Sequence, residues 1–203
     1  MLTPTNSYIL GILWGTLSYY SEGFWLRHRD HWYINTVRDY LELSPAGHES
    51  YSPTGRQHRL KITSRKDVAK ITKILSAHGW APRKAQVRPY PLGNIDDRSF
   101  IRAWTELHGH ADIRRARGRD GSHFPQRRLR IYGNFALLEE INLILSSACN
   151  LRPRKLQGTS NEITKALYYQ GKNVLPVMSW LYAEASIFNP SARTSFWETL
   201  SLS

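Results

Sequence analysis

Two stretches of the sequence alternate apolar and basic side chains and then stop at a residue that can begin a helix. They read GFWLRHRD at 23–30 and QRRLRIYG at 126–133. Alternation with a period of two predicts β-strands, here with one apolar face and one basic face. Each strand must therefore cover a core while it faces something anionic.

Helical and strand periodicities surround the first of these stretches in a regular order. Helices are predicted at 4–19, 30–43 and 64–79, and strands at 23–29 and 56–63. The helix at 30–43 has Asp30 as its expected N-cap, and the helix at 64–79 ends at a glycine. The first part of the chain therefore reads helix, strand pair, helix, strand pair, helix.

The second part of the chain repeats this order. A helix is predicted at 96–109, a hairpin at 111–132 with Asp120 and Gly121 in its turn, and a helix at 133–148. Short strands at 151–157 and 165–171 precede a last helix at 173–185.

The two parts can be aligned with offsets that only increase, as loop insertions require. Offsets of 92, 103 and 107 positions place Ile9 on Ile101, Leu26 on Leu129 and Leu60 on Leu167. Amphipathic helices resemble one another by chance, which is the alternative explanation. The repeat predicts an α+β fold of two pseudo-symmetric αββαββα units, with a saddle of antiparallel sheets. The expected divisions are 1–79 for the first repeat, 80–96 for a stiff, extended linker, 97–185 for the second repeat and 186–203 for a tail.

Composition favours a folded, basic protein with a polyanionic partner. The 203 residues are 41% apolar, include seven Trp and carry a net charge of +12 with a pI near 10. Nucleic acid is the expected partner, since a basic membrane binder usually concentrates its charge on one amphipathic helix. Cys149 is the only cysteine, which excludes a disulfide framework and a zinc knuckle. The apolar run at 8–17 is too short to span a bilayer, so we expect a cytoplasmic, nucleoid-associated protein without membrane contact.

The helices that lead the two repeats carry matching motifs, ILGILWGTLS at 9–18 and IRAWTELHGH at 101–110. Together with the repeated element order, they resemble the single-chain LAGLIDADG homing endonucleases. The resemblance implies that the two leading helices pack against each other, that both sheets lie in the DNA major groove, and that an acid at the foot of each leading helix holds a divalent metal. The residues expected at the helix contact are Gly11, Gly15, Ala103 and Leu107.

The motifs depart from this family at its metal-binding acids, which fall at Thr16 and His108 in this sequence. A hydroxyl and an imidazole are poor ligands for Mg²⁺, which prefers anionic oxygen. Glu106 cannot replace His108, because two positions on a helix correspond to about 200° of rotation. We therefore predict no catalytic residues, no metal site and no cofactor; Mg²⁺ would be needed only if the chain were an active nuclease. The alternation of His108, His110 and Asp112 is weak evidence for a metal without a fourth ligand.

The basic and aromatic residues of the predicted strands are the expected DNA-binding residues, because arginine can form paired hydrogen bonds with guanine and with phosphate. A solvated basic edge strand is the alternative. The predicted DNA-binding residues are Trp25, Arg27, Arg29, Arg59, Lys61, Arg114, Arg115, Arg117, Arg119, Arg128, Arg130, Tyr132, Arg154, Lys155 and Gln157.

These features predict a sequence-specific double-stranded DNA-binding protein that binds an asymmetric or pseudo-palindromic site as a monomer. The resemblance, without the acids, implies a transcription regulator from a mobile element or phage, derived from a homing endonuclease and related to WhiA-type regulators. Two alternatives stay open. One is an active LAGLIDADG homing endonuclease that cleaves duplex DNA with a divalent metal, and the other is an RNA-binding maturase.

Overall fold

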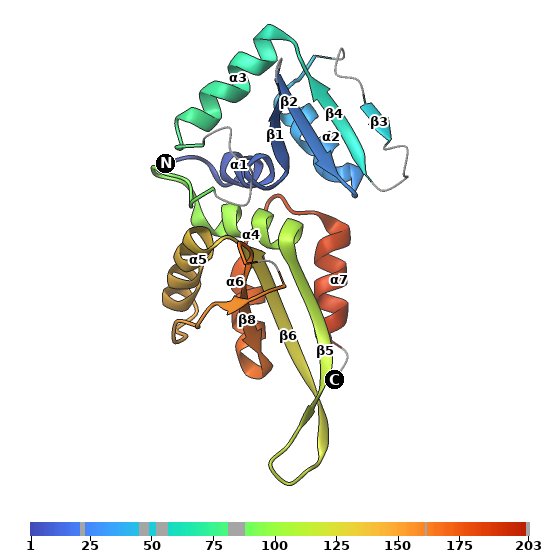
Figure 1. Ribbon diagram of the computed structural model, residues 1–203, viewed down its shortest axis with the longest axis vertical. Coiled ribbons are helices and arrows are strands. Elements are labelled where there is room, and N and C mark those ends of the chain that lie inside the picture. The colour runs from blue at the N-terminus through green and yellow to red at the C-terminus, as the bar shows by residue number, and fades with distance from the viewer. Residues whose placement is uncertain (21–22, 45–48, 52–56, 81–87, 161, 202–203) are drawn as a thin grey trace.

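The computed structural model in Figure 1 describes residues 1–20, 23–44, 49–51, 57–80, 88–160 and 162–201. Its first half begins with a helix, continues with two strands and a second helix, and ends with two strands and a third helix. The bounds of these elements are α1 Pro4–Thr16, β1 Leu17–Tyr20, β2 Gly23–His28, α2 His31–Tyr40, β3 Glu49–Tyr51, β4 His58–Ile62 and α3 Arg65–Ser76.

The second half repeats this element order, with a short 3₁₀ helix η2 inserted before its last helix. A further helix, α7, follows the repeat. The bounds are α4 Asp97–His108, β5 Gly109–Arg117, β6 His123–Gly133, α5 Phe135–Ala148, β7 Gln157–Gly158, β8 Lys165–Gln170, η2 Gly171–Asn173, α6 Val174–Tyr182 and α7 Pro190–Ser201. The α+β fold of two αββαββα repeats, predicted from the sequence, is confirmed.

Both sheets have the same topology. Among the described residues each has four antiparallel strands, in the orders β1-β2-β4-β3 and β5-β6-β8-β7. In each sheet, the strand that follows the leading helix pairs with the next strand in the chain. That second strand then pairs with the last strand of its repeat. The strands β2 and β6, which carry the two alternating stretches, are therefore in the interior of their sheets.

Helices α1 and α4 pack against each other between the two sheets, in the middle of the molecule (Figure 1). All residues of α1 from Ser7 to Trp14 are buried, so this helix is covered on every side. Helix α4 buries Ser99 through Glu106. The two leading helices therefore form the centre of a core that extends into both halves.

Capping residues place the beginnings of the helices where the sequence predicts them. The side chain of Asp30 accepts from the backbone N–H of Trp32 at 2.9 Å, and that of Asp96 accepts from Ser99 at 2.8 Å. Asn134 caps α5 in the same way. None of the described helices combines the length and the apolar character that a membrane crossing requires.

Three segments differ from the sequence-based expectation. Helix α1 ends at Thr16 rather than at 19, because residues 17–20 pair with β2 as strand β1. The expected strand at 151–157 is reduced to Gln157–Gly158, and the residues before it are irregular. Within the predicted linker, residues 81–87 lie outside the described residues, whereas Arg88 is buried and Pro89 accepts a hydrogen bond from Trp14 at 2.9 Å.

The tail forms helix α7, which packs beside β5 (Figure 1). Asn189 caps this helix through its side-chain oxygen, which accepts from the backbone N–H groups of Ser191 and Ala192. The amide nitrogen of its side chain donates to Asp30 in the first half at 2.7 Å, and its backbone N–H donates to Glu106 at 3.0 Å. A single residue thus links the tail to both halves.

Candidate nucleic-acid interface

The alternation along β2 and β6 gives each sheet one buried face and one polar face. Leu26 on β2 is fully buried, whereas its neighbour Arg27 is exposed. Leu129 and Ile131 on β6 are likewise fully buried, with the partly exposed Arg130 between them. Helix packing on the apolar faces leaves the basic faces available to a partner.

The first-sheet surface combines three cations with two aromatic rings: Tyr20, Trp25, Arg27, Arg59 and Lys61. Strand pairing places Trp25 opposite Lys61 and Arg27 opposite Arg59. The guanidinium of Arg27 lies 5.4 Å from the ring centre of Trp25, and the ammonium of Lys61 lies 5.3 Å from that of Tyr20. Partial burial and the neighbouring charge of Arg59 lower the pKa of Arg27. Two adjacent guanidinium groups form a positive surface that suits an anionic backbone.

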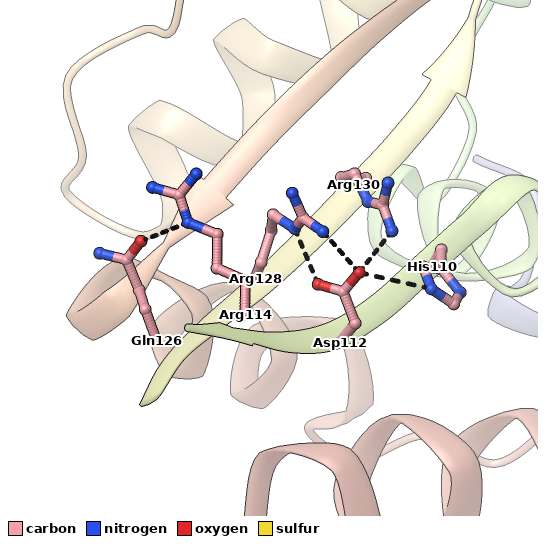
Figure 2. A network of polar contacts seen from close by, with 6 residues as sticks. All are labelled: His110, Asp112, Arg114, Gln126, Arg128 and Arg130. Atoms are coloured by element: carbon pink, nitrogen blue, oxygen red, sulfur yellow. Dashed lines mark hydrogen bonds and ion pairs between the residues drawn. The ribbon is translucent and has the colours of Figure 1, made fainter. Parts of the chain in front are cut away.

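The second-sheet surface is a network of polar contacts among six residues of β5 and β6, shown in Figure 2. The contacts form two groups, one of His110, Asp112, Arg128 and Arg130 and one of Arg114 and Gln126. The carboxylate of Asp112 accepts two hydrogen bonds from Arg128, both at 2.7 Å, and a third from Arg130 at 2.5 Å. The Nε of Arg114 donates to the side-chain oxygen of Gln126 at 3.0 Å. Each of the three arginines is therefore held by an acceptor on the same face of the sheet.

The charge of this network remains positive. Hydrogen bonding from Arg128 is the main reason why the pKa of Asp112 lies below its ordinary value, so this carboxylate is ionised at neutral pH. It also lies 3.6 Å from Nε2 of His110. One carboxylate thus faces two guanidinium groups and an imidazole, and the surface attracts anions.

The β5–β6 hairpin extends well beyond the rest of the sheet (Figure 1). Strand alternation places Arg115 and Arg117 on the face opposite to Arg114 and Arg128, and Arg119 lies in the turn. The turn contains Gly121 with a φ of +83°, next to Asp120 as predicted. The arginines of the hairpin therefore occupy both faces of a two-stranded ribbon.

The remaining predicted DNA-binding residues lie at the margins of the two surfaces. Arg29 is exposed and lies just beyond the end of β2. Tyr132 shares the face of Arg130 on β6 and is partly exposed. Arg154 and Lys155 lie in the irregular segment before β7, and Gln157 lies in β7 itself.

The structure brings together the four residues expected at the helix contact. A Cβ added at Gly11 would lie 2.7 Å from Cβ of Ala103, and one added at Gly15 would lie 3.0 Å from Cδ1 of Leu107. The same Cβ at Gly15 would lie 2.7 Å from Nε2 of His108. The backbones approach closely because glycine has no side chain.

Among the residues that the structure describes, the feet of the two helices do not provide the ligands that a hard divalent ion needs. The hydroxyl of Thr16 donates to the carbonyl oxygen of Ile12 in its own helix at 2.7 Å. Burial, with the nearby charge of His28, lowers the pKa of His108 to about 4, so its imidazole is neutral. The guanidinium of Arg88 donates to the carbonyl oxygens of Trp14 and Leu17, at 2.5 and 2.7 Å. A cation of the protein therefore lies at the foot of the first helix, and no carboxylate is present at either motif position.

Glu106 cannot supply the missing acid. Its carboxylate accepts hydrogen bonds from the hydroxyl of Tyr8 and from the backbone N–H of Asn189, and Glu106 as a whole is only 8% exposed. Burial raises its pKa to about 7. Glu22, the other acid near the motifs, lies outside the described residues. The described part of the chain contains no group of three or more His, Cys, Asp or Glu side chains arranged to hold a metal ion.

Sequence reasoning missed several residues of these surfaces and of the helix feet. Asp112 attracted notice only because it alternates with two histidines, and its pairing with Arg128 depends on the register of the hairpin. Gln126 carries no charge, and nothing in the sequence indicated that it belongs to this surface. Arg88 lies in a segment without hydrophobic periodicity, so nothing in the sequence indicated that it is buried.

Comparison with known proteins identifies the fold. Neither the family models nor the curated proteins contain a match to the sequence. Among solved structures, the LAGLIDADG meganuclease I-AabMI bound to uncleaved DNA has a TM-score of 0.71 at 11% identity, covering 98% of this chain and 90% of that chain. I-CpaMI bound to uncleaved DNA has a TM-score of 0.63 at 10% identity, covering 98% and 97%. The I-LtrWI homing endonuclease bound to target DNA has a TM-score of 0.61 at 9% identity, covering 94% and 87%. The repeated elements, the close contact of the leading helices and these similarities show that the chain has the two-repeat LAGLIDADG-like fold.

Proposed function

We propose that this protein binds double-stranded DNA sequence-specifically, as a monomer, and acts by occupying its site rather than by cutting it. The observation that carries the proposal is the pair of basic strand surfaces, one on each sheet, on the faces that the core does not use. A two-stranded ribbon and its sheet fit the width of the DNA major groove, and arginine is the residue best suited to guanine and phosphate.

The solved neighbours support a duplex as the partner. I-AabMI, I-CpaMI and I-LtrWI were each crystallised with DNA. In the present chain, the first-sheet surface places Arg27 beside Arg59, and the second-sheet surface places three arginines along β5 and β6. A phosphate backbone that lies across both sheets would be contacted by cations from both repeats, which is why one chain suffices for one site.

The feet of the leading helices support binding without cleavage. Metal-assisted cleavage needs ligands that hold the ion against the attacking water and the leaving oxygen. Here Thr16 is hydrogen-bonded within its own helix, His108 is neutral and Arg88 lies beside them. We infer that the protein is a transcription regulator, from a mobile element or phage, whose scaffold derives from a nuclease.

The experiment that tests this function is selection of bound duplexes from a random pool, followed by incubation of the selected duplexes with protein and Mg²⁺ or Mn²⁺. We expect enrichment of one sequence, one chain per duplex and intact DNA. Preferential selection of RNA from a mixed pool, or cutting that EDTA abolishes, would contradict the proposal. A reporter gene placed behind the selected site then tests regulation directly.

A further inference from the structure

The carboxylate of Asp112 holds Arg128 by one particular edge of its guanidinium. The hydrogen bonds come from Nε and from Nη2, each at 2.7 Å, so the pair is bidentate along the side of the guanidinium group. The Nη2 of Arg130 donates to Oδ2 of Asp112, which also accepts from Nη2 of Arg128. Figure 2 shows the three side chains lying together on one face of the sheet.

The contact with Asp112 occupies one edge of the Arg128 guanidinium and leaves its other edge unoccupied by this contact. A guanidinium has five N–H groups, and a side-on carboxylate takes the Nε–H and one Nη2–H. The second Nη2–H and one Nη1–H then point together from the end of the side chain. Two parallel donors in this arrangement match O6 and N7 of guanine in the major groove.

Holding the side chain in place also lowers the cost of binding. A free arginine loses substantial rotamer freedom when it is fixed by a base, whereas an arginine already fixed by a neighbour loses less. Gln126 gives Arg114 a similar acceptor, at 3.0 Å from Nε. On the first-sheet surface the cations lie over aromatic rings instead, as Arg27 does over Trp25. The two sheets therefore present their basic residues differently.

We propose that Asp112 is a positioning residue that fixes Arg128 and Arg130 for base recognition, so that sequence discrimination in the half-site under the second sheet depends on this carboxylate. The inference rests on the proposed function. An acidic residue on a DNA-facing surface repels phosphate and so weakens binding. The sequence discrimination that Asp112 provides accounts for its presence on this surface.

The test compares unmodified protein with Asp112→Asn, by selection of bound duplexes and by titration of a selected site and a scrambled duplex. We expect the base preference to weaken in one half-site only. The ratio of affinities for the selected and the scrambled duplex should fall by about tenfold, since a good bidentate pair discriminates to roughly that extent. Affinity for the scrambled duplex should stay equal or increase, because one negative charge has been removed. A carboxylate with a merely structural role would weaken binding to both duplexes.

Glu139→Gln is the matched control, because it removes one exposed carboxylate from α5, which packs against the other face of the same sheet. It should leave the base preference unchanged. If Asp112→Asn does not fold, Arg128→Lys keeps the charge but removes the fork, and it should weaken the same half-site. If the variant that is measured keeps the base preference unchanged, or loses it equally in both half-sites, the inference about Asp112 is overturned. The proposed function is not affected by either result. Failure of the unmodified protein to select any duplex would overturn the proposed function itself.

Discussion

Gly11 and Ala103 touch where α1 and α4 cross, and a Cβ added to the glycine would lie 2.7 Å from that of the alanine and 2.9 Å from the carbonyl oxygen of Phe100. Backbone atoms cannot move aside as a flexible side chain can. We therefore expect Gly11→Ala to lower the free energy of unfolding by about 1 to 3 kcal/mol, and Gly11→Leu by at least as much.

Urea denaturation of the purified variants measures this effect. Gly158→Ala is the control, because an added Cβ there meets nothing within 4 Å. The control should unfold at nearly the same urea concentration as the unmodified protein. If Gly11→Leu did so too, the packing of the two leading helices would be disproved.

Affinity for DNA should depend on both strand surfaces. Arg27→Ala and Arg128→Ala should each weaken binding to the selected duplex by about 1 to 3 kcal/mol, because each removes a guanidinium from a sheet face. Lys73→Ala on α3 is the control, since this lysine is exposed beside Ala77 and His78, away from the strands. Fluorescence anisotropy titrations at fixed salt would measure the differences. Equal affinity in all four proteins would remove the sheets from the interface.

The unmodified protein should not cleave the duplex that it binds. Without carboxylates at positions 16 and 108, the motif positions would not hold a metal ion against the attacking water. Incubation with Mg²⁺ or Mn²⁺, followed by denaturing electrophoresis, would detect nicks in either strand. We expect the double variant Thr16→Asp, His108→Asp to stay inactive as well, because the guanidinium of Arg88 lies at the foot of α1. Nicking by the double variant that EDTA abolishes would show that Arg88 does not prevent metal binding.

Stability should fall as pH rises, through the titration of Glu106. Burial raises the pKa of this carboxyl to about 7 in the folded protein, above its ordinary value of 4.5. The folded state therefore holds a proton that the unfolded state has released, and this contribution to stability is lost between about pH 4.5 and pH 7. The loss is on the order of 3 kcal/mol.

The variant Glu106→Gln isolates this effect, because glutamine does not titrate. The difference in unfolding free energy between the variant and the unmodified protein should increase from pH 5 to pH 8 in favour of the variant. Glu139→Gln, on the exposed side of α5, should show no such trend. A constant difference between Glu106→Gln and the unmodified protein would mean that Glu106 is already ionised at low pH.

The local signals in the sequence predict the helices of both repeats and the repeated order of the elements. Asp30 and Asp96 begin helices because their short carboxylates satisfy free backbone N–H groups, an effect that depends on neighbours in the chain. The alternation at Arg128 and Arg130 likewise depends only on the period of a strand. The end of α1 was placed too late, because residues 17–20 continue its apolar character while they pair with β2.

The hydrogen-bond partners of the polar side chains could not be predicted from such local signals. Asp112 meets Arg128, which is sixteen positions later in the chain, only because the hairpin turn sets the register of the two strands. Arg88 meets Trp14 and Leu17 across an even longer separation, from a segment without periodicity. Such contacts depend on the packing of whole elements, and a short sequence window contains no information about them.

The complete burial of α1 has a consequence for how the chain can be made and divided. Ser7 through Trp14 are synthesised early, whereas α4, which covers one side of them, emerges from the ribosome only after the whole first repeat. Until then the nascent chain exposes an apolar helix face with no cover of its own. A gene fragment that ends before Asp97 would therefore encode a product that pairs through α1 with another chain or aggregates. The two repeats resemble separate modules, yet each supplies one of the two helices at the centre of the shared core.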